Sequence, residues 1–225
     1  MEREEHENQF SSNQLFKLDG YQICVICDQD EGKNELGTGF LFMRKDWIIT
    51  AAHVIQVDGL CRINLYAQFP ISGINKVKLK VISVHVESDI ALLQIVSEEN
   101  PCERPLFPGY DDLSVSKGLV CCGYTPSKGN TITIGLVKNY SKDFRHRKET
   151  EVIFEYESID IEAGCSGGPI FGDGGLVLGI MINLFIIEEE PYKKFVRATS
   201  IQNLTKALSI DFNQDIMKPI NQKEI

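Results

Sequence analysis

Short β-type runs, arranged in two groups around a turn-rich gap, limit what this chain can fold into more than any other feature. In Lys76–Val81, lysine alternates with valine or leucine, and a period of two is typical of a half-buried strand. The gap, Ser97–Lys117, holds three prolines and Gly109, which predicts a linker. About six runs lie on each side of it: Tyr21–Cys27, Gly37–Met43, Trp47–Thr50, Leu60–Phe69, Lys76–Val86 and Asp89–Val96, then Gly118–Tyr124, Thr131–Tyr140, Glu151–Tyr156, Gly168–Phe171, Leu176–Ile187 and Lys193–Ser200.

Many short strands and few helices predict an all-β fold, built as barrels or as a sandwich. The length of 225 residues suits one large all-β domain or two small barrels that share a core. Residues 1–19 are polar and charged and are expected to form an N-terminal arm. Ile201–Ile210 combines leucines with helix-forming lysine and alanine, which predicts one C-terminal helix.

Charge and hydropathy exclude several classes of partner. The net charge of −9 argues against nucleic acid as the main partner. No apolar run approaches the ~20 residues that a membrane span needs, so no membrane partner is expected. The chain opens with Met-Glu-Arg-Glu-Glu-His-Glu, which lacks the basic start and apolar stretch of a secretory signal. We therefore expect a cytoplasmic protein.

The seven cysteines support the same expectation, because an odd number without regular pairing is not a disulfide framework. Cys24 and Cys27 form a C-x-x-C, but they lie in a predicted strand, where positions three apart face opposite sides. Cys121 and Cys122 are adjacent and fail in the same way. We therefore expect no metal site and no cofactor.

One basic patch interrupts the acidic chain. It can be a solvated loop between two strands, which is the simpler interpretation, or a docking patch for an acidic partner or regulator. Its residues are Lys142, Arg145, His146, Arg147 and Lys148.

The segment Gly164-Cys165-Ser166-Gly167-Gly168-Pro169 has the composition of a tight turn around a serine. Its glycines allow backbone N–H groups to converge on one point. The N–H groups of Gly164 and Ser166 could then donate to a developing oxyanion. The alternative is a glycine-rich turn with no chemistry.

Two further segments place polar side chains beside apolar strands. His53 follows Thr50-Ala51-Ala52, where small residues allow a strand to pack closely as it turns. Asp89 begins the apolar run Ile90-Ala91-Leu92-Leu93, and a buried carboxylate must be paired or hydrogen-bonded. A histidine ring would satisfy it, although a structural histidine and a turn-capping aspartate are the simpler alternatives.

Together, the three segments bring His53, Asp89 and Ser166 into one of the known chain orders for a Ser-His-Asp triad. At this level the sequence resembles the trypsin/chymotrypsin-like serine peptidases over roughly residues 20–210. The matching pieces are Gly37-Thr38-Gly39-Phe40, Thr50–His53, Asp89–Leu93, Gly164 with Ser166–Pro169, and Leu178-Gly179-Ile180.

The resemblance implies two six-stranded antiparallel β-barrels of the chymotrypsin-like type, followed by the C-terminal helix. The domains would be an arm (1–19), an N-terminal barrel (20–105), a C-terminal barrel (106–200) and a helix with a tail (201–225). His53 and Asp89 would come from the first barrel and Ser166 from the second, with Gly164 and Ser166 forming the oxyanion hole. The expected function is a serine endopeptidase acting on a protein or peptide substrate through an acyl-enzyme.

The same resemblance suggests where a substrate would bind. A peptide would add as a strand along Met181, Ile182, Asn183 and Leu184. Asp160, six residues before Ser166, would select arginine or lysine at P1 by charge-assisted hydrogen bonds. Glu162 is an alternative acidic wall of that pocket, and Leu184 would narrow it.

Cys165 marks a departure from the family. Digestive and clotting members carry aspartate there, which pairs with a freshly cut N-terminus, so activation by such cleavage is not expected here. We expect control by an activating protein partner, a ligand or loop ordering, as in a bacterial immune or stress effector. Cys165 itself is not the expected nucleophile, because viral relatives place cysteine where Ser166 stands. The competing function is a catalytically silent interaction module with a protease fold.

Overall fold

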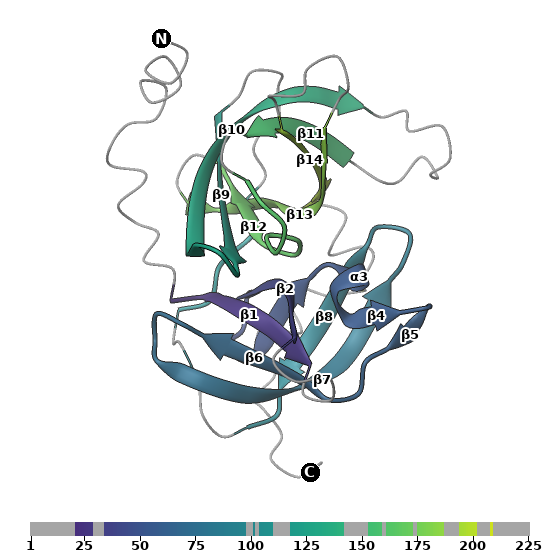
Figure 1. Ribbon diagram of the computed structural model, residues 1–225, viewed down its shortest axis with the longest axis vertical. Helices are drawn as coiled ribbons and strands as arrows, with labels where there is room; N and C mark the ends of the chain where they lie inside the picture. The colour runs from purple at the N-terminus through teal and green to yellow at the C-terminus, as the bar shows by residue number, and fades with distance from the viewer. Residues whose placement is uncertain are drawn as a thin grey trace.

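The computed structural model describes residues 21–28, 34–97, 101, 104–109, 118–141, 153–158, 161–172, 175–186, 194–201 and 208. Most of them lie in β-strands that close into two barrels (Figure 1). The first barrel contains β1 (Ile23–Asp28), β2 (Asn34–Leu41), β3 (Trp47–Thr50), β6 (Leu65–Phe69), β7 (Ile74–His85) and β8 (Ile90–Ile95). The second contains β9 (Gly118–Thr125), β10 (Gly129–Ser141), β11 (Ile153–Ser158), β12 (Pro169–Phe171), β13 (Val177–Ile186) and β14 (Lys194–Ser200).

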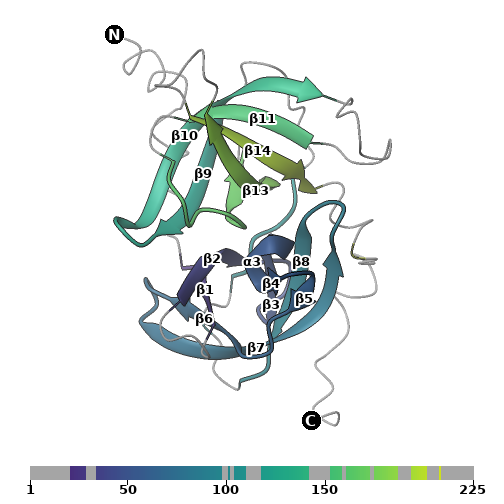
Figure 2. The same cartoon turned by 45° about the vertical axis from the view of Figure 1, so that its right-hand side comes forward.

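The two barrels repeat one pattern of antiparallel pairing. The strand order is β1-β2-β3-β8-β7-β6 in the first barrel and β10-β11-β14-β13-β12-β9 in the second. Figures 1 and 2 show the barrels one above the other, with the short helix α3 (Ala52–Ile55) on the side of the first barrel that faces the second. The predicted chymotrypsin-like pair of six-stranded barrels is therefore confirmed.

Three apolar clusters explain the strongly apolar runs of the sequence. Ile26, Ile48 and the other inward side chains of the first barrel form one cluster, and the inward side chains of the second barrel form another. The third cluster lies between the barrels and joins Phe40 and Ile49 to Val120 and Phe171. Strands such as β1 and β3 are buried along their whole length, because each has one face inside its barrel and the other toward this third cluster.

Residues 104–109 of the linker are paired to both barrels. Leu106 donates its N–H to the Leu41 carbonyl over 2.9 Å and accepts from the Met43 N–H over 2.8 Å. Gly109 donates to the Val177 carbonyl over 2.8 Å. This linker segment, which shows no periodicity in the sequence, thus holds the two barrels together through backbone hydrogen bonds.

The predicted run Leu60–Phe69 is not one strand. It divides into β5 (Leu60–Cys61), which pairs with β4 (Gln56–Val57), and β6. Between them Arg62 donates its N–H to the Ile55 carbonyl, over 2.9 Å, and pairs with the Asp28 carboxylate. These contacts turn the chain, and they leave Leu60 and Ile63 exposed to solvent.

Several predictions fall on residues outside the described ones: the N-terminal arm, the basic patch at 142–148, and Asp160. The C-terminal helix is not confirmed, since only Ile201 and Leu208 of that segment are described. The four domain boundaries also stay predictions. No helix in the described portion is long and apolar enough to cross a membrane.

Candidate active site

His53 lies in the first turn of α3, and Asp89 satisfies the backbone there. The helix has no side-chain cap from Ala51, so its first N–H groups need acceptors from elsewhere. The Asp89 carboxylate accepts the His53 N–H over 2.8 Å, and the Asp89 carbonyl accepts the Ala52 N–H over 3.1 Å. Asp89 is left-handed, with φ of 54°, a conformation that aspartate tolerates better than most residues. One residue directly before β8 thus fixes the helix that presents His53.

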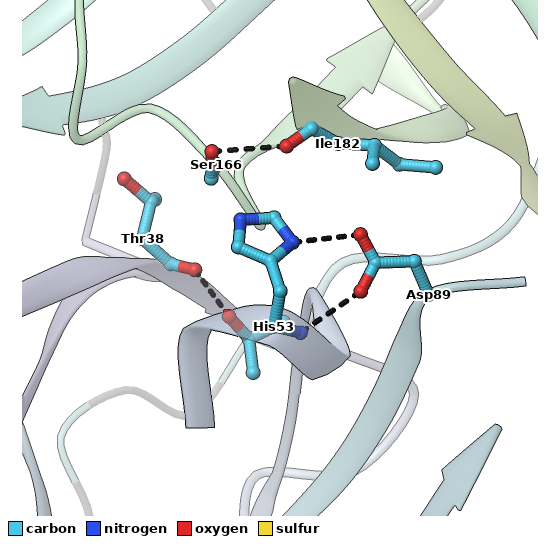
Figure 3. Close-up of polar contacts among 6 residues, drawn as sticks. Thr38, His53, Asp89, Ser166 and Ile182 are labelled. Atoms are coloured by element: carbon cyan, nitrogen blue, oxygen red, sulfur yellow. Dashed lines mark hydrogen bonds and ion pairs between the residues drawn. The ribbon is translucent and has the colours of Figure 1, made fainter. Parts of the chain in front are cut away.

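The His53 ring and the Asp89 carboxylate are hydrogen-bonded, with 2.7 Å between Nδ1 and Oδ2 (Figure 3). A carboxylate can only accept, so Nδ1 carries the proton and a neutral ring keeps Nε2 as an acceptor. Asp89 is mostly buried, whereas 46% of the His53 side chain is exposed. The pair therefore orients a basic nitrogen toward solvent and toward the second barrel.

Ser166 lies in a turn that only glycine can complete on either side. Gly164 and Gly167 have φ of 104° and 86°. A Cβ on Gly164 would lie 2.7 Å from the Tyr124 carbonyl oxygen, and one on Gly167 would overlap the Thr38 carbonyl oxygen. The glycines that the sequence placed around Ser166 are thus required by close backbone approach as well as by conformation.

The Ser166 hydroxyl donates to the carbonyl oxygen of Ile182 over 3.0 Å (Figure 3). Among the described residues, no hydrogen bond joins Ser166 to His53. Both side chains belong to one cluster in the close-up, with His53 on the first barrel and Ser166 on the second. The structure thus brings the two predicted residues into one site without forming the bond between them.

A β-bulge on β13 explains why the Ile182 carbonyl is available. Met181 pairs with Ala198 and Asn183 pairs with Arg197, so Ile182 is the extra residue in the ladder. Bulges of this kind redirect backbone groups next to active sites. The carbonyl that leaves the β-ladder is the one that accepts from Ser166.

The four predicted substrate-binding residues of β13 differ in what they can offer. Met181 is buried and its backbone is occupied, since it accepts from the Gly167 N–H over 2.7 Å and donates to the Gly168 carbonyl over 2.9 Å. Asn183 and Leu184 are exposed. β13 pairs with β12 only as far as Ile180. Among the described strands, the part of β13 that follows Met181 therefore pairs with β14 alone, and its other edge is open.

Cys165 is buried behind the turn and is a poor nucleophile in this environment. Only 3% of the residue is exposed. Burial raises the pKa of its thiol, which keeps it protonated, although the Glu162 backbone partly offsets this. Because the thiolate is the reactive form, the geometry supports the choice of Ser166 over Cys165.

Glu162 faces the β9–β10 turn. Its carboxylate pairs with Lys128 Nζ at 2.6 Å and accepts from the Ser127 hydroxyl at 2.7 Å. These contacts occupy both carboxylate oxygens. They do not favour Glu162 as an acidic wall for a substrate side chain, and Asp160 lies outside the described residues.

Thr38 and Thr50 are site residues to which the sequence assigned no role. Thr50 donates its hydroxyl to the Thr38 carbonyl over 2.6 Å, and Thr38 donates its own hydroxyl to the Gly164 carbonyl over 2.7 Å. Both threonines are buried. The only signal in the sequence was their place inside matching motifs, because the contact between Thr38 and Gly164 spans the two barrels.

Two closed barrels with a histidine–aspartate pair on one and a glycine-bounded serine on the other define a protein of the trypsin-like class. The model of the trypsin-like peptidase domain matches residues 37–180. The chain belongs to this family, and the predicted family is confirmed.

Curated relatives of this chain are named as serine endoproteases, and similar solved structures include proteases. A probable periplasmic serine endoprotease, DegP-like, from Pseudomonas savastanoi pv. phaseolicola is 26% identical over 189 residues, which are 84% of this chain and 35% of the relative. The chain thus spans about a third of the length of that relative. Two solved structures have the same fold with a TM-score of 0.68: the active form of the Rv3671c protease from M. tuberculosis, at 21% identity covering 88% of this chain and 83% of that one, and Deg5, at 22% covering 92% and 93%.

The prediction of a cytoplasmic location is contradicted. Three relatives, from two Pseudomonas species and Halomonas elongata, are named as periplasmic endoproteases. The prediction depended on the opening residues and on cysteine parity. Both are weaker indications than the relatives, since two that match 84% of this chain are named as periplasmic.

Proposed function

We propose that the protein is a serine endopeptidase that cuts peptide bonds through an acyl-enzyme formed on Ser166. The observation that carries the proposal is the His53–Asp89 hydrogen bond, which leaves His53 Nε2 as an acceptor on the side of Ser166. The names of the relatives support the same activity and a periplasmic setting for it.

In this mechanism His53 takes the proton from the Ser166 hydroxyl as its oxygen attacks the scissile carbonyl carbon. Asp89 holds the ring tautomer and stabilises the imidazolium. The N–H groups of Gly164 and Ser166 donate to the oxyanion, and one such donor is typically worth about 3 kcal/mol. His53 then protonates the leaving amine as the C–N bond breaks. Water hydrolyses the ester by the same route in reverse.

The substrate is proposed to be an extended peptide that adds to the free edge of β13. Main-chain hydrogen bonds would supply affinity along Ile182–Leu184, since Met181 is already bonded to the serine turn. Arginine or lysine at P1 is proposed through Asp160. Fluorogenic peptides with arginine, leucine or glutamate at P1 test this, and equal rates on all three would contradict the role of Asp160.

Activation by a protein partner is part of the proposal. Two observations support it: Cys165 stands where a carboxylate would receive a cleaved N-terminus, and the Ser166 hydroxyl rests on Ile182. A partner or the bound substrate would raise the rate by freeing the Ser166 hydroxyl for His53, and the protein alone should still label and cleave slowly. Rapid cleavage of generic peptides by the purified protein alone would contradict a requirement for a partner.

A fluorophosphonate probe, which reacts only with an activated serine, tests the activity directly. We expect labelling of Ser166 in the wild-type chain, no labelling of Ser166→Ala, and loss of peptide hydrolysis in the same variant. A correctly folded wild type that neither labels nor cleaves would favour the alternative, a silent binding module.

A further inference from the structure

All three polar groups of Thr38 are hydrogen-bonded at the site, and two of them, the N–H and the hydroxyl, reach residues of the second barrel. Its N–H donates to the Ser166 carbonyl over 2.8 Å, and its carbonyl accepts from the Thr50 hydroxyl. Its hydroxyl donates to the Gly164 carbonyl and accepts from the Tyr124 N–H over 2.9 Å. We infer that Thr38 is a positioning residue that fixes the oxyanion-binding turn and links it to the segment bearing His53. This inference rests on the proposed function.

The first step in the argument is that Thr38 holds both residues proposed to bind the oxyanion. The carbonyls of Gly164 and Ser166 each accept a hydrogen bond from it, at 2.7 Å and 2.8 Å. The N–H of each residue is then the group left to face a substrate. Gly164 has no side chain to restrict its rotation, and its φ of 104° lies where glycine alone moves freely. The Gly164 carbonyl lies in the peptide unit that follows its Cα, so the bond from Thr38 anchors one side of the residue and leaves only the φ and ψ of Gly164 to set the direction of its N–H.

The second step is that the Thr38 hydroxyl can point only one way. It accepts from the Tyr124 N–H, so its single proton is directed at the Gly164 oxygen. The residue is fully buried, and hydrogen bonds in a chain strengthen one another where water is excluded. The orientation of the Gly164 carbonyl thus depends on two linked hydrogen bonds, from the Tyr124 N–H to the Thr38 hydroxyl and from that hydroxyl to the Gly164 carbonyl.

The third step connects this turn to His53. Thr50 ends β3 three residues before His53, and its hydroxyl proton goes to the Thr38 carbonyl. Next to Thr38, the backbone at Gly37 packs too closely against the serine turn and α3 to admit a side chain. A Cβ on Gly37 would lie 2.9 Å from the Ser166 carbonyl oxygen and 2.8 Å from the Val54 side chain. A shift of the serine turn would therefore also displace Thr38, Thr50 and the start of α3.

Thr38→Val tests the inference, because it keeps the branched shape and removes the hydroxyl. Thr38→Ser keeps the hydroxyl and should restore function. Thr199→Val is the matched control: Thr199 is also fully buried in a strand, and its hydroxyl has no hydrogen-bond partner in the described part of the chain.

We expect Thr38→Val to lower kcat roughly 10- to 100-fold, below the full loss of one oxyanion donor, with KM within about twofold. Its affinity for a peptide aldehyde, which forms an oxyanion on Ser166, should fall by the same factor as kcat. Thr38→Ser should recover most of the activity, and Thr199→Val should match the wild type. Thermal unfolding of all variants separates this effect from loss of folded protein.

Amide hydrogen exchange gives a readout that needs no activity. Tyr124 should exchange faster in Thr38→Val than in the wild type or Thr38→Ser, because its acceptor is gone. Wild-type kcat in a folded Thr38→Val, an equal loss in Thr199→Val, or unchanged Tyr124 exchange would each overturn the inference. A wild type that neither labels with fluorophosphonate nor cleaves peptides would instead overturn the proposed function, and the positioning role of Thr38 with it.

Discussion

The hydroxyl of Ser166 donates to the carbonyl oxygen of Ile182 across 3.0 Å, although His53 lies in the same site. The acceptor belongs to the bulged residue of β13, whose carbonyl is released from pairing with β14. A peptide added to this edge would bring its own N–H groups to the same carbonyl. Substrate binding would then displace the Ser166 hydroxyl and free it to donate to His53 Nε2.

The bond between His53 and Asp89 should not depend on Ser166, since Asp89 holds the ring and the His53 backbone by itself. We expect the strongly deshielded Nδ1 proton to persist in the NMR spectrum of Ser166→Ala. Asp89→Asn should lose this signal and lower kcat by about 10⁴-fold, because the amide favours the wrong ring tautomer. Loss of the signal in Ser166→Ala would show that the serine supports the pair, contrary to this prediction.

The ion pair between Glu162 and Lys128 should help to hold the turn that carries Gly164, since it ties residue 162 to the β9–β10 turn at 2.6 Å. Both side chains are partly exposed, so the pair is worth at most about 1 kcal/mol. We expect Glu162→Gln or Lys128→Gln to lower kcat by about two- to fivefold. The charge reversal Glu162→Lys with Lys128→Glu should restore it.

Lys80→Gln controls for the loss of one surface charge, because Lys80 is exposed on β7 in the other barrel. The decrease should also weaken at high salt, which screens the pair. If Glu162→Gln instead removed a preference for arginine at P1, Glu162 would be the wall of the pocket and the structural role assigned here would be wrong.

The strands could be predicted from the sequence because their signal is local. The alternation in Lys76–Val81 and the apolar run at Trp47–Thr50 each depend on a few neighbouring residues, and both are strands in the structure. The run Leu60–Phe69 looked continuous for the same reason. What divides it is a contact from Arg62 to Asp28, which are 34 residues apart.

The detailed contacts of the site could not be predicted from the sequence, because they depend on the three-dimensional fold. Motif order was enough to select His53, Asp89 and Ser166, but no local pattern shows that Ile182 is a bulge or that Met181 is already bonded. The contact from Thr38 to Gly164 joins residues 126 apart. Such contacts are set by how the barrels pack, and a single sequence has no periodicity that reports them.

Gly167 should be far less tolerant of substitution than Gly129, although both are left-handed, with φ of 86° and 73°. A Cβ on Gly129 would meet nothing within 4 Å, whereas one on Gly167 would overlap the Thr38 carbonyl oxygen and the Thr50 hydroxyl. Gly129→Ala should therefore cost only the backbone penalty, about 1–2 kcal/mol. Gly167→Ala should lose several kcal/mol of unfolding free energy, measured in urea, and all peptide hydrolysis. Equal losses of unfolding free energy in the two variants would show that the turn around Gly167 rearranges to accommodate a Cβ, contrary to this prediction.

The buried thiol of Cys122 should make the fold sensitive to alkali. Burial, with a smaller contribution from Cys165, raises the pKa of Cys122 to about 12 from 9.0. Below pH 9 the thiol is protonated in the folded and unfolded chains, so it leaves stability unchanged. Above pH 9 only the unfolded chain ionises. Stability should therefore fall as pH rises from 9 toward 12, by roughly 1.4 kcal/mol per pH unit for one such thiol.

Other groups titrate in the same range, so the measurement is the difference between variants. Urea unfolding at pH 8, 9, 10 and 11 should give a shallower loss for Cys122→Ala than for the wild type. Cys61→Ser is the control, since Cys61 is exposed and should leave the slope unchanged. Iodoacetamide should accordingly modify Cys61 in the folded protein and reach Cys122 only on unfolding. Parallel slopes for the wild type and Cys122→Ala would show that this thiol does not couple folding to pH.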